Sequence, residues 1–386
     1  IRGSYGTVGN ADGISNFGAR GLYSITQEAS YSGLPGAAPY QKGNPDLSWE
    51  KIESANIGAD FSLWNRISVS LDVYEKKASE LLYRKPLAAT TGYSYVWVNA
   101  GSVRNRGLEF SILSQNIKKE DFTWETNFNM AFNRNKVLEL SDGAKVFNPG
   151  ARQPIAVGYD MDAYNFPIWA GVDPENGDPL WEKITVDGNG NQTKTTTNKY
   201  SEAASSDSRQ FTGTSAAPKF TGGMNNALTY KDFTFSAFFN FVYGNYVYND
   251  TRAYFDNDGL YEAFNSMVLP DGWTRWEKPG DNATHPKPIV GGNKESNQSS
   301  SRYLENGSYL RLRNIKLGYN LPQSVISKMR LSKLHVFVSA DNVWTLTNFS
   351  GPDPEVSLSQ VDLSSGMSSF KYPVTRRFLF GLNLTF

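Results

Sequence analysis

The stretch Arg377-Phe-Leu-Phe-Gly-Leu-Asn-Leu-Thr-Phe386 decides how the rest of the chain is interpreted. Successive side chains of an extended strand point to opposite faces. One face is therefore apolar and aromatic, and it carries Phe378, Phe380, Leu382, Leu384 and Phe386. The other face is mostly small or polar. A strand of this kind with an aromatic last residue is typical of the closing strand of an outer-membrane β-barrel, although a soluble β-sandwich can also end this way.

The composition favours an antiparallel all-β chain. Aromatic residues make up 14% of the 386 residues, yet the mean hydropathy is -0.48. Strands with one apolar and one polar face, joined by very polar loops, produce this combination. Lys+Arg and Asp+Glu number 38 each, and a net charge of zero argues against a nucleic-acid partner. The sequence has no Cys, which excludes disulfides and thiolate metal sites.

Alternating segments predict four β-hairpins. The apolar faces of 55–63 and 67–74 match across a short turn at Trp64, Asn65 and Arg66, which fixes their register. The other hairpins are 108–112 with 122–133, 220–230 with 233–243, and 309–321 with 334–340, the last through a helical reversal at 322–330. We also expect a strand at the start of the chain that ends in a turn at 6–13. With the terminal strand, this gives about ten strands.

Short and long connections alternate along the chain. The four reversals are short, and the segments between them are long and rich in Gly, Asn, Asp, Ser and Pro. Loops longer than roughly 15 residues are uncommon in compact soluble domains. Outer-membrane barrels, in contrast, combine short periplasmic turns with long external loops. Aromatic residues gather near the short turns, as expected for a girdle at the membrane interface: Phe61, Trp64, Phe122, Trp124, Tyr230, Phe233 and Tyr319.

Several motifs occur in one order along the chain. They are Arg2-Gly-Ser-Tyr-Gly-Thr-Val-Gly-Asn10, Asn44-Pro-Asp-Leu-Ser-Trp-Glu-Lys51, Asn99-Ala-Gly-Ser-Val-Arg-Asn-Arg-Gly-Leu-Glu109, Gly171-Val-Asp-Pro-Glu-Asn-Gly-Asp-Pro179, Ser308-Tyr-Leu-Arg-Leu-Arg-Asn314, Asp341-Asn342, Gly351-Pro-Asp-Pro-Glu355 and Gly381-Leu-Asn-Leu-Thr-Phe386. Each is weak alone. Together they resemble the SusC/RagA family of TonB-linked (TonB-dependent) outer-membrane transporters.

The resemblance implies that residues 1–386 are the C-terminal part of a transmembrane antiparallel β-barrel of 22 strands with long extracellular loops. The plug domain and the N-terminal barrel strands would lie upstream, because the sequence opens at Ile1 in the middle of a strand. The implied location is the bacterial outer membrane, in contact with membrane lipid. The implied partners are a SusD-like lipoprotein lid, TonB through the missing N-terminal region, and an oligosaccharide or peptide cargo. A dimer of transporter–lid pairs is among the expected assemblies.

Aromatic residues in the long loops are the candidate binding residues. Exposed rings stack on sugar rings or peptide side chains, and a neutral chain suits an uncharged cargo. The predicted substrate-binding set, with neighbours that supply hydrogen bonds, is Tyr93, Tyr95, Trp97, Asn99, Trp169, Trp181, Asp271, Trp273 and Trp276. Packing of these rings between loops, or against the lid, is the alternative for each residue.

The sequence predicts no enzyme, no cofactor and no metal. It contains no nucleophile elbow, phosphate loop or zinc motif. His335 alternates with apolar residues in a strand and so is expected to face the barrel lumen. The stretches 173–178 and 187–191 are weakly calcium-like, but turn chemistry explains both better, and Asp256-Asn-Asp-Gly259 is a slightly stronger calcium-like pattern. The alternative functions are a passive outer-membrane porin and a surface glycan-binding β-rich module.

Overall fold

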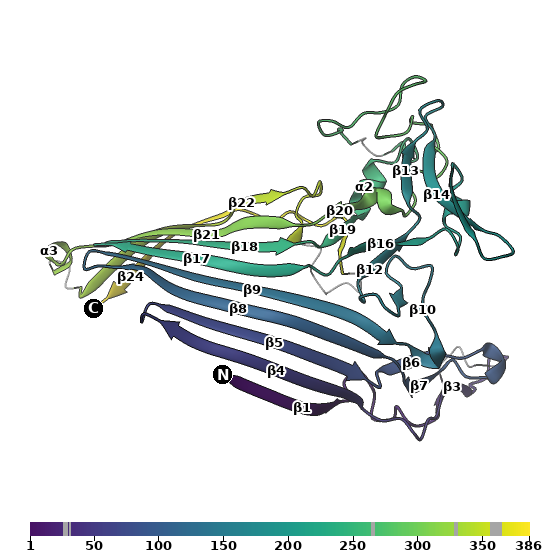
Figure 1. Cartoon of the computed structure of the whole chain (residues 1–386), viewed down its shortest axis with the longest axis horizontal. Coiled ribbons are helices and arrows are strands. Elements are labelled where there is room, and N and C mark those ends of the chain that lie inside the picture. The colour runs from purple at the N-terminus through teal and green to yellow at the C-terminus, as the bar shows by residue number, and fades with distance from the viewer. Residues whose placement is uncertain (26–29, 31, 264–266, 328–330, 356–364) are drawn as a thin grey trace.

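The computed structural model describes residues 1–25, 30, 32–263, 267–327, 331–355 and 365–386. Within these residues, ten strands form one curved antiparallel sheet in the order β1-β4-β5-β8-β9-β17-β18-β21-β22-β24 (Figure 1). Their bounds are β1 Arg2–Asn10, β4 Glu50–Leu63, β5 Ile67–Ser79, β8 Ser102–Lys118, β9 Phe122–Glu139, β17 Phe220–Tyr230, β18 Phe233–Tyr243, β21 Tyr309–Asn320, β22 Lys333–Thr347 and β24 Arg377–Thr385. β1 and β24 are the two edges, so the sheet forms an open wall of a barrel. The predicted all-β class and the count of about ten strands are confirmed.

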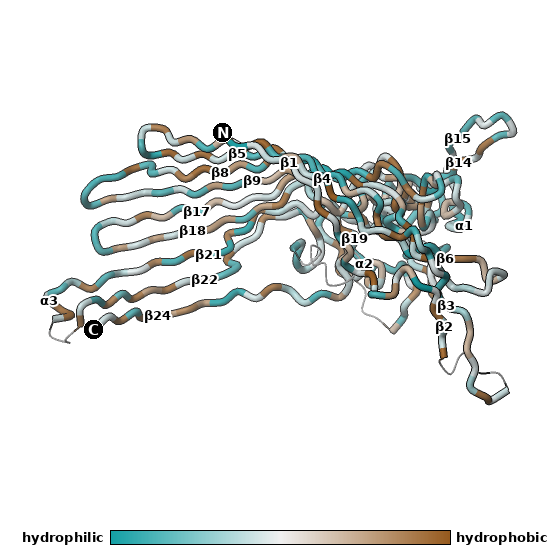
Figure 2. The backbone as a smooth tube through the Cα atoms, turned by 90° about the horizontal axis from the view of Figure 1, so that it is seen from below, coloured by the Kyte–Doolittle hydropathy of each residue, from teal (hydrophilic) through white to brown (hydrophobic). Residues whose placement is uncertain are grey.

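The register of the sheet separates an apolar face from a polar face. Val73 lies opposite Ile57 and Leu108, and this apolar row continues across the sheet. Asn127, one residue before Phe128, lies opposite Asn225 on the polar face. Because side chains alternate, every strand contributes to both faces, and Figure 2 shows this alternation of hydropathy along the strands. The faces follow the predicted register, with the apolar one expected to meet lipid and the polar one expected to line a lumen.

The short turns all lie at one end of the sheet (Figure 1). Trp64 and Asn65 form the first turn with positive φ angles of 53° and 52°, which lets the chain reverse within three residues. The reversal between β21 and β22 contains α3 (Gln323–Ile326), as predicted, while residues 328–330 of the predicted segment lie outside the described residues. Among the described residues, no helix is long and apolar enough to cross a membrane.

The first strand is longer than the sequence pattern predicted. The expected turn at 6–13 is wrong in its first half, because β1 stays paired from Arg2, opposite Gly58, to Asn10, opposite Glu50. The partner strand β4 already begins at Glu50, well before its apolar alternation starts. Backbone hydrogen bonds from β4 therefore continue β1 beyond the apolar band. There, the alternation of apolar and polar side chains does not reveal a strand.

The long connections fold into a layer of small sheets at the opposite end, which we call the loop layer (Figure 1). Its strands are β2 Leu22–Ser24, β3 Ala38–Lys42, β6 Leu82–Pro86, β7 Tyr95–Asn99, β10 Val146–Phe147, β11 Ile155–Ala156, β12 Ala163–Phe166, β13 Trp169–Val172, β14 Pro179–Val186, β15 Gln192–Thr197, β16 Gln210–Ser215, β19 Tyr246–Asn249, β20 Leu304–Asn306 and β23 Met367–Ser368, with helices α1 Tyr200–Ala203 and α2 Asp250–Phe255. Tyr164, Phe166, Tyr248 and Tyr303 form its buried aromatic core. The loop layer is therefore a folded unit with its own core.

Candidate functional site

An ion cluster on the polar face of the sheet joins motifs that are far apart in the sequence. Arg311 of β21 pairs with Asp353 at 2.7 Å, and their side chains are only 3% and 5% exposed. Arg313 pairs with Glu355 at 2.8 Å, and Glu355 also accepts a hydrogen bond from Arg311. These four residues, with Asp341, define the polar-face ion cluster. It fixes the segment that follows β22 against the wall of the sheet.

A β-bulge at Arg313 aims neighbouring side chains at this cluster. The pairing of β21 with β18 passes from Leu312, opposite Phe239, to Asn314, opposite the adjacent Phe238, and leaves Arg313 as an extra residue. A bulge shifts the alternation by one residue, so Arg313 and Asn314 can both reach the polar face. Asn314 then donates to Asp341 at 2.7 Å. One residue separates Arg311 from Arg313, and one residue separates Asp353 from Glu355. This matching spacing is the sequence signal that could have predicted the cluster.

A second, deeply buried ion cluster holds the loop layer together. Asp256 and Asp258 have no exposed side-chain surface, and Arg302 pairs with them at 3.3 Å and 2.6 Å. Arg275 lies 2.8 Å from Asp258, and Arg252 lies 3.4 Å from Asp256. We call these five residues the loop ion cluster. The carboxylates that weakly suggested calcium therefore face guanidinium groups.

The charges around Asp256 lower the pKa of its carboxyl group. Burial alone would raise the pKa of Asp256, but Arg302, His285 and Arg252 outweigh burial and lower this pKa to about 2. Burial raises the pKa of the neighbouring Tyr303 hydroxyl above its ordinary value. Asp256 thus stays ionised, and Tyr303 stays neutral, at physiological pH.

His285 lies between a hydroxyl and a carboxylate in an arrangement that superficially resembles a catalytic triad. Its Nδ1 is 2.8 Å from Thr284 Oγ1, and its Nε2 is 2.8 Å from Asp256 Oδ2. However, Thr284 Oγ1 also hydrogen-bonds the backbone N–H and carbonyl of Thr274 at 2.9 Å and 3.1 Å. A nucleophile needs a hydroxyl that is free to attack. The geometry therefore favours a structural bridge between loop segments.

Two of the predicted binding residues stack on arginines of the loop ion cluster. Arg252 lies 4.3 Å from the ring centroid of Trp273, and Arg302 lies 4.8 Å from that of Trp169. Tyr303 lies between the two arginines, 5.4 Å from Arg252 and 5.3 Å from Arg302. Cation–π contacts of this kind engage one face of each ring. Sequence reasoning did not identify these arginines, because their aromatic partners are remote in the chain.

Other predicted binding residues are packed within the loop layer. Trp181 has 0% exposure and contacts the rings of Trp169 and Tyr200. Tyr95 is 9% exposed, donates a hydrogen bond to Gln41 and is covered by the guanidinium of Arg84. For Trp181 and Tyr95 we therefore adopt packing between loops, the alternative reading of the sequence, in place of contact with cargo.

The remaining predicted residues keep exposed surface. Asn99 joins two backbone segments by donating to the carbonyls of Ser48 and Glu80. Asp271 is exposed, and Tyr93, Trp97 and Trp276 are partly exposed. The indole N–H of Trp276 donates to the carbonyl of Pro174 at 2.8 Å, which fixes the ring.

The predicted residues form two separate groups in space. Residues 95–99 are β7, in the sheet of β2, β3, β6 and β7. Trp169 and Trp181 lie in β13 and β14, where Trp276 hydrogen-bonds Pro174, and Trp273 packs on Arg252 of α2. Figure 2 shows the β2–β3 and β14–β15 hairpins projecting from this layer in different directions. The structure therefore does not gather the predicted residues into one pocket.

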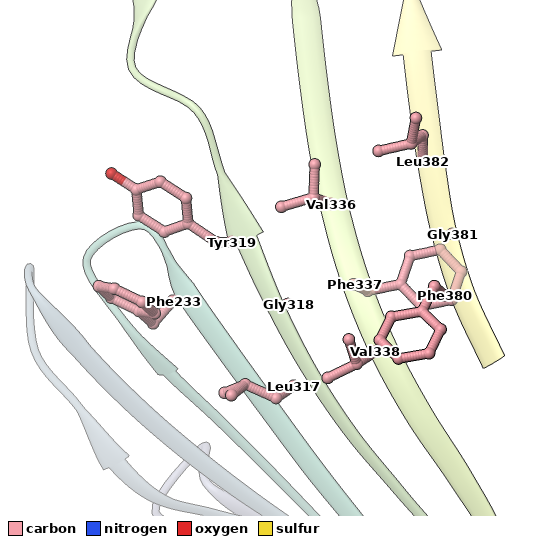
Figure 3. A pocket seen from close by; sticks show the side chains of 10 residues that line it. All are labelled: Phe233, Leu317, Gly318, Tyr319, Val336, Phe337, Val338, Phe380, Gly381 and Leu382. Carbon is pink, nitrogen blue, oxygen red and sulfur yellow. The ribbon is translucent and has the colours of Figure 1, made fainter. Parts of the chain in front are cut away.

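An apolar groove of about 740 Å³ lies far from these rings, toward the short-turn end of the sheet. The short side chains of Val336 and Val338 lie between Leu317 of β21 and Phe380 and Leu382 of β24 (Figure 3). All five side chains belong to the apolar face by register. The groove is a feature of the face that is expected to meet lipid.

Comparison with known proteins agrees with this architecture. Residues 1–343 match the family described as TonB dependent receptor-like, beta-barrel. The TonB-dependent receptor P3 of Formosa agariphila is 31% identical over all of this chain and 39% of its own length. The TonB-dependent receptor SusC of Bacteroides thetaiotaomicron is 28% identical over all of this chain and 37% of its own length. The chain thus spans about two fifths of the length of these relatives.

Solved structures show the same similarity in three dimensions. The structure of the RagAB peptide transporter superposes with a TM-score of 0.83 and 28% identity, over 100% of this chain and 40% of that one. The RagAB peptide importer in its open-open state gives a TM-score of 0.83 with 27% identity, again over 100% and 40% of the two chains. With a family match over most of its length, the chain belongs to the TonB-dependent receptor β-barrel family of outer-membrane proteins.

Proposed function

We propose that this chain is the C-terminal wall and loop layer of an outer-membrane transporter that imports a nutrient oligosaccharide or peptide. TonB would supply the energy through a region upstream of residue 1, and a SusD-like lipoprotein would cover the loop layer. The observation that carries the proposal is the similarity to the RagAB peptide transporter, which extends over the whole chain with a TM-score of 0.83. A polar face beneath an ordered loop layer supports it, because cargo needs a wet path and a fixed entrance.

The proposal assigns no catalysis to this chain. The two ion clusters pair their carboxylates with guanidinium groups, and the hydroxyl beside His285 is already hydrogen-bonded to backbone. Neither arrangement offers an unpaired acid or base at an open site, which general acid–base catalysis needs.

Contact with cargo or lid is proposed for the residues that keep exposed surface. Trp276 is held by its hydrogen bond to Pro174, and one face of its ring packs against Gly177. A fixed ring loses little conformational entropy on binding, which suits stacking on a sugar or a peptide side chain. Trp97 and Tyr93, with Asp271 as a hydrogen-bond acceptor, are the other candidates. Trp169 and Trp273 can contribute only the ring surface that the arginines leave uncovered.

Uptake by intact cells tests this proposal. Trp97→Ala and Trp276→Ala should each weaken cargo binding by about 1 kcal/mol, or roughly fivefold, with unchanged amounts of folded protein. Trp64→Ala is the matched control, because this tryptophan is 79% exposed at the short-turn end, away from the loop layer. Uptake should stop when the proton-motive force is dissipated. Continued uptake under that condition would identify a passive porin and refute the proposal.

A further inference from the structure

A polar pocket of about 470 Å³ lies on the lumen face at the short-turn end of the sheet. Its lining includes Lys316 of β21, Lys333 and His335 of β22, and Thr229, Thr234 and Asn383 of neighbouring strands. The lining contains no Asp or Glu. In outer-membrane barrels the short turns are periplasmic, so this pocket lies at the periplasmic end of the lumen wall.

Two glycines leave room for the aromatic rings beside this pocket. A Cβ at Gly318 would overlap the imidazole of His335, and a Cβ at Gly381 would overlap the ring of Phe337. Glycine at both positions allows these two rings to lie flat over the adjacent strands. The rings then stack on each other with centroids 6.0 Å apart and an interplanar angle of 25°. Nδ1 of His335 hydrogen-bonds Asn320 Oδ1 at 3.0 Å, which fixes the imidazole.

Among the described residues, no carboxylate pairs with the two lysines of this pocket. Lys316 Nζ lies 4.0 Å above the centroid of Phe337, and a cation–π contact stabilises an ammonium group without removing its charge. In the part of the chain that the structure describes, neither Lys316 nor Lys333 forms an ion pair with a carboxylate. The polar-face ion cluster, in contrast, matches every arginine with a carboxylate.

We propose that this pocket, defined by Lys316, Lys333 and His335, is a binding site for an oxyanion group, a carboxylate or a phosphate. Two ammonium groups supply the charge, and the hydroxyl and amide groups of Thr229, Thr234 and Asn383 are additional hydrogen-bond donors. The inference is independent of the identity of the cargo. The same chemistry is satisfied by an acidic side chain from another part of the same polypeptide or by a dissolved anion, and the experiment separates these two sources.

These 386 residues contain no Cys, so a single introduced cysteine is the one thiol within them. Thr229→Cys would be placed in the full-length transporter in outer-membrane vesicles and treated with anionic and cationic methanethiosulfonate reagents. Two nearby lysines should raise the ratio of anionic to cationic reaction rates by about tenfold at 0.1 M salt. Asn129→Cys is the matched control, because it lies on the same face farther from the short turns. Adding Lys316→Gln and Lys333→Gln should return the ratio at residue 229 to the control value.

Two further measurements identify the source of the anion. Inorganic phosphate should slow the anionic reagent at residue 229 if the site takes a dissolved anion. If an acidic side chain occupies the site, the cysteine should be protected, and a carbodiimide should cross-link Lys316 or Lys333 to that residue, as mapped by mass spectrometry. A rate ratio equal to the control, or a protected cysteine without any cross-link, would overturn the proposal. Folded protein is verified for each variant by its heat-modifiable migration on gels.

Discussion

A charge on the apolar face of a strand should destabilise the barrel far more than the same charge on the lumen face, one residue away. Phe128 and Asn127 are neighbours in β9, and their side chains point to opposite faces of the sheet. Phe128 lies opposite Met224 on the apolar face, and Asn127 lies opposite Asn225 on the lumen face. We expect Phe128→Arg to destabilise the barrel strongly and Asn127→Arg to be nearly neutral.

The cost at residue 128 follows from its position. Phe128 is six residues from Phe122 at the short-turn end of β9, which places it roughly 15 Å into the membrane for a strand tilted by about 40°. An arginine near the midplane costs about 2–4 kcal/mol. Phe128 also contacts Phe110 and Phe241, with centroid distances of 5.7 Å and 6.1 Å. Loss of these two ring pairs adds about 1–3 kcal/mol, for a total of about 3–7 kcal/mol.

The assay is urea unfolding of the full-length protein in lipid vesicles, followed by tryptophan fluorescence and heat-modifiable migration on gels. Phe128→Arg should lower the unfolding midpoint or prevent assembly. Asn127→Arg should leave the midpoint within the range of neutral substitutions, because its guanidinium reaches water in the lumen. Equal losses for the two variants would refute the assigned faces of the sheet.

Three further predictions concern the ion clusters and the orientation of the chain. Arg311→Met leaves the buried Asp353 unpaired, while Glu355 keeps Arg313, and should cost about 3–5 kcal/mol locally. The loss should be seen as faster hydrogen exchange in residues 348–355. Arg106→Met, which removes an exposed pair, should change exchange there by little. Because the pKa of Asp256 is lowered to about 2 in the folded state, its contribution to the stability of the loop layer should be full above about pH 4 and lost between pH 4 and 2. Loop-layer tryptophan fluorescence measures this loss, and Asp256→Asn should abolish the transition. A tag inserted at Gly190 should be reached by antibody on intact cells, and a tag at Asn65 should not. Labelling at Asn65 would show that the chain has the opposite orientation in the membrane.

The wall of the sheet could be predicted from the sequence because both of its faces leave a strong pattern. In β18, Phe235, Phe239 and Phe241 share one face, and Thr234, Ser236 and Asn240 lie on the other face. Lipid on one side and water on the other require this alternation. The pattern fades where strands leave the membrane, and for that reason the sequence underestimated β1 and the first residues of β4.

The loop layer could not be predicted in the same way. Its strands are short, its sequence is rich in turn formers, and its stability comes from contacts between remote segments. Trp169 and Trp273 illustrate the difficulty, because each meets an arginine on a different loop. Aromatic composition indicated that these rings were important, but only the fold shows that guanidinium groups occupy one face of each ring. Segment 191–208, which reads as a polar loop, likewise contains β15 and α1.

The two ion clusters have a common physical consequence for the entrance of the barrel. Separating Arg302 from Asp258, or Arg311 from Asp353, would leave buried charges unpaired at a cost of about 3–5 kcal/mol for each pair. These pairs connect the segment around 250–306 to itself and the segment after β22 to the wall. The segment after β22 is thereby fixed to the sheet, and the loop segments 252–302 are fixed to one another, so Trp276 beside Arg275 is presented to solvent by a rigid frame. Binding to such a frame requires little ordering of the protein, and the affinity for cargo then depends mainly on the contacts themselves.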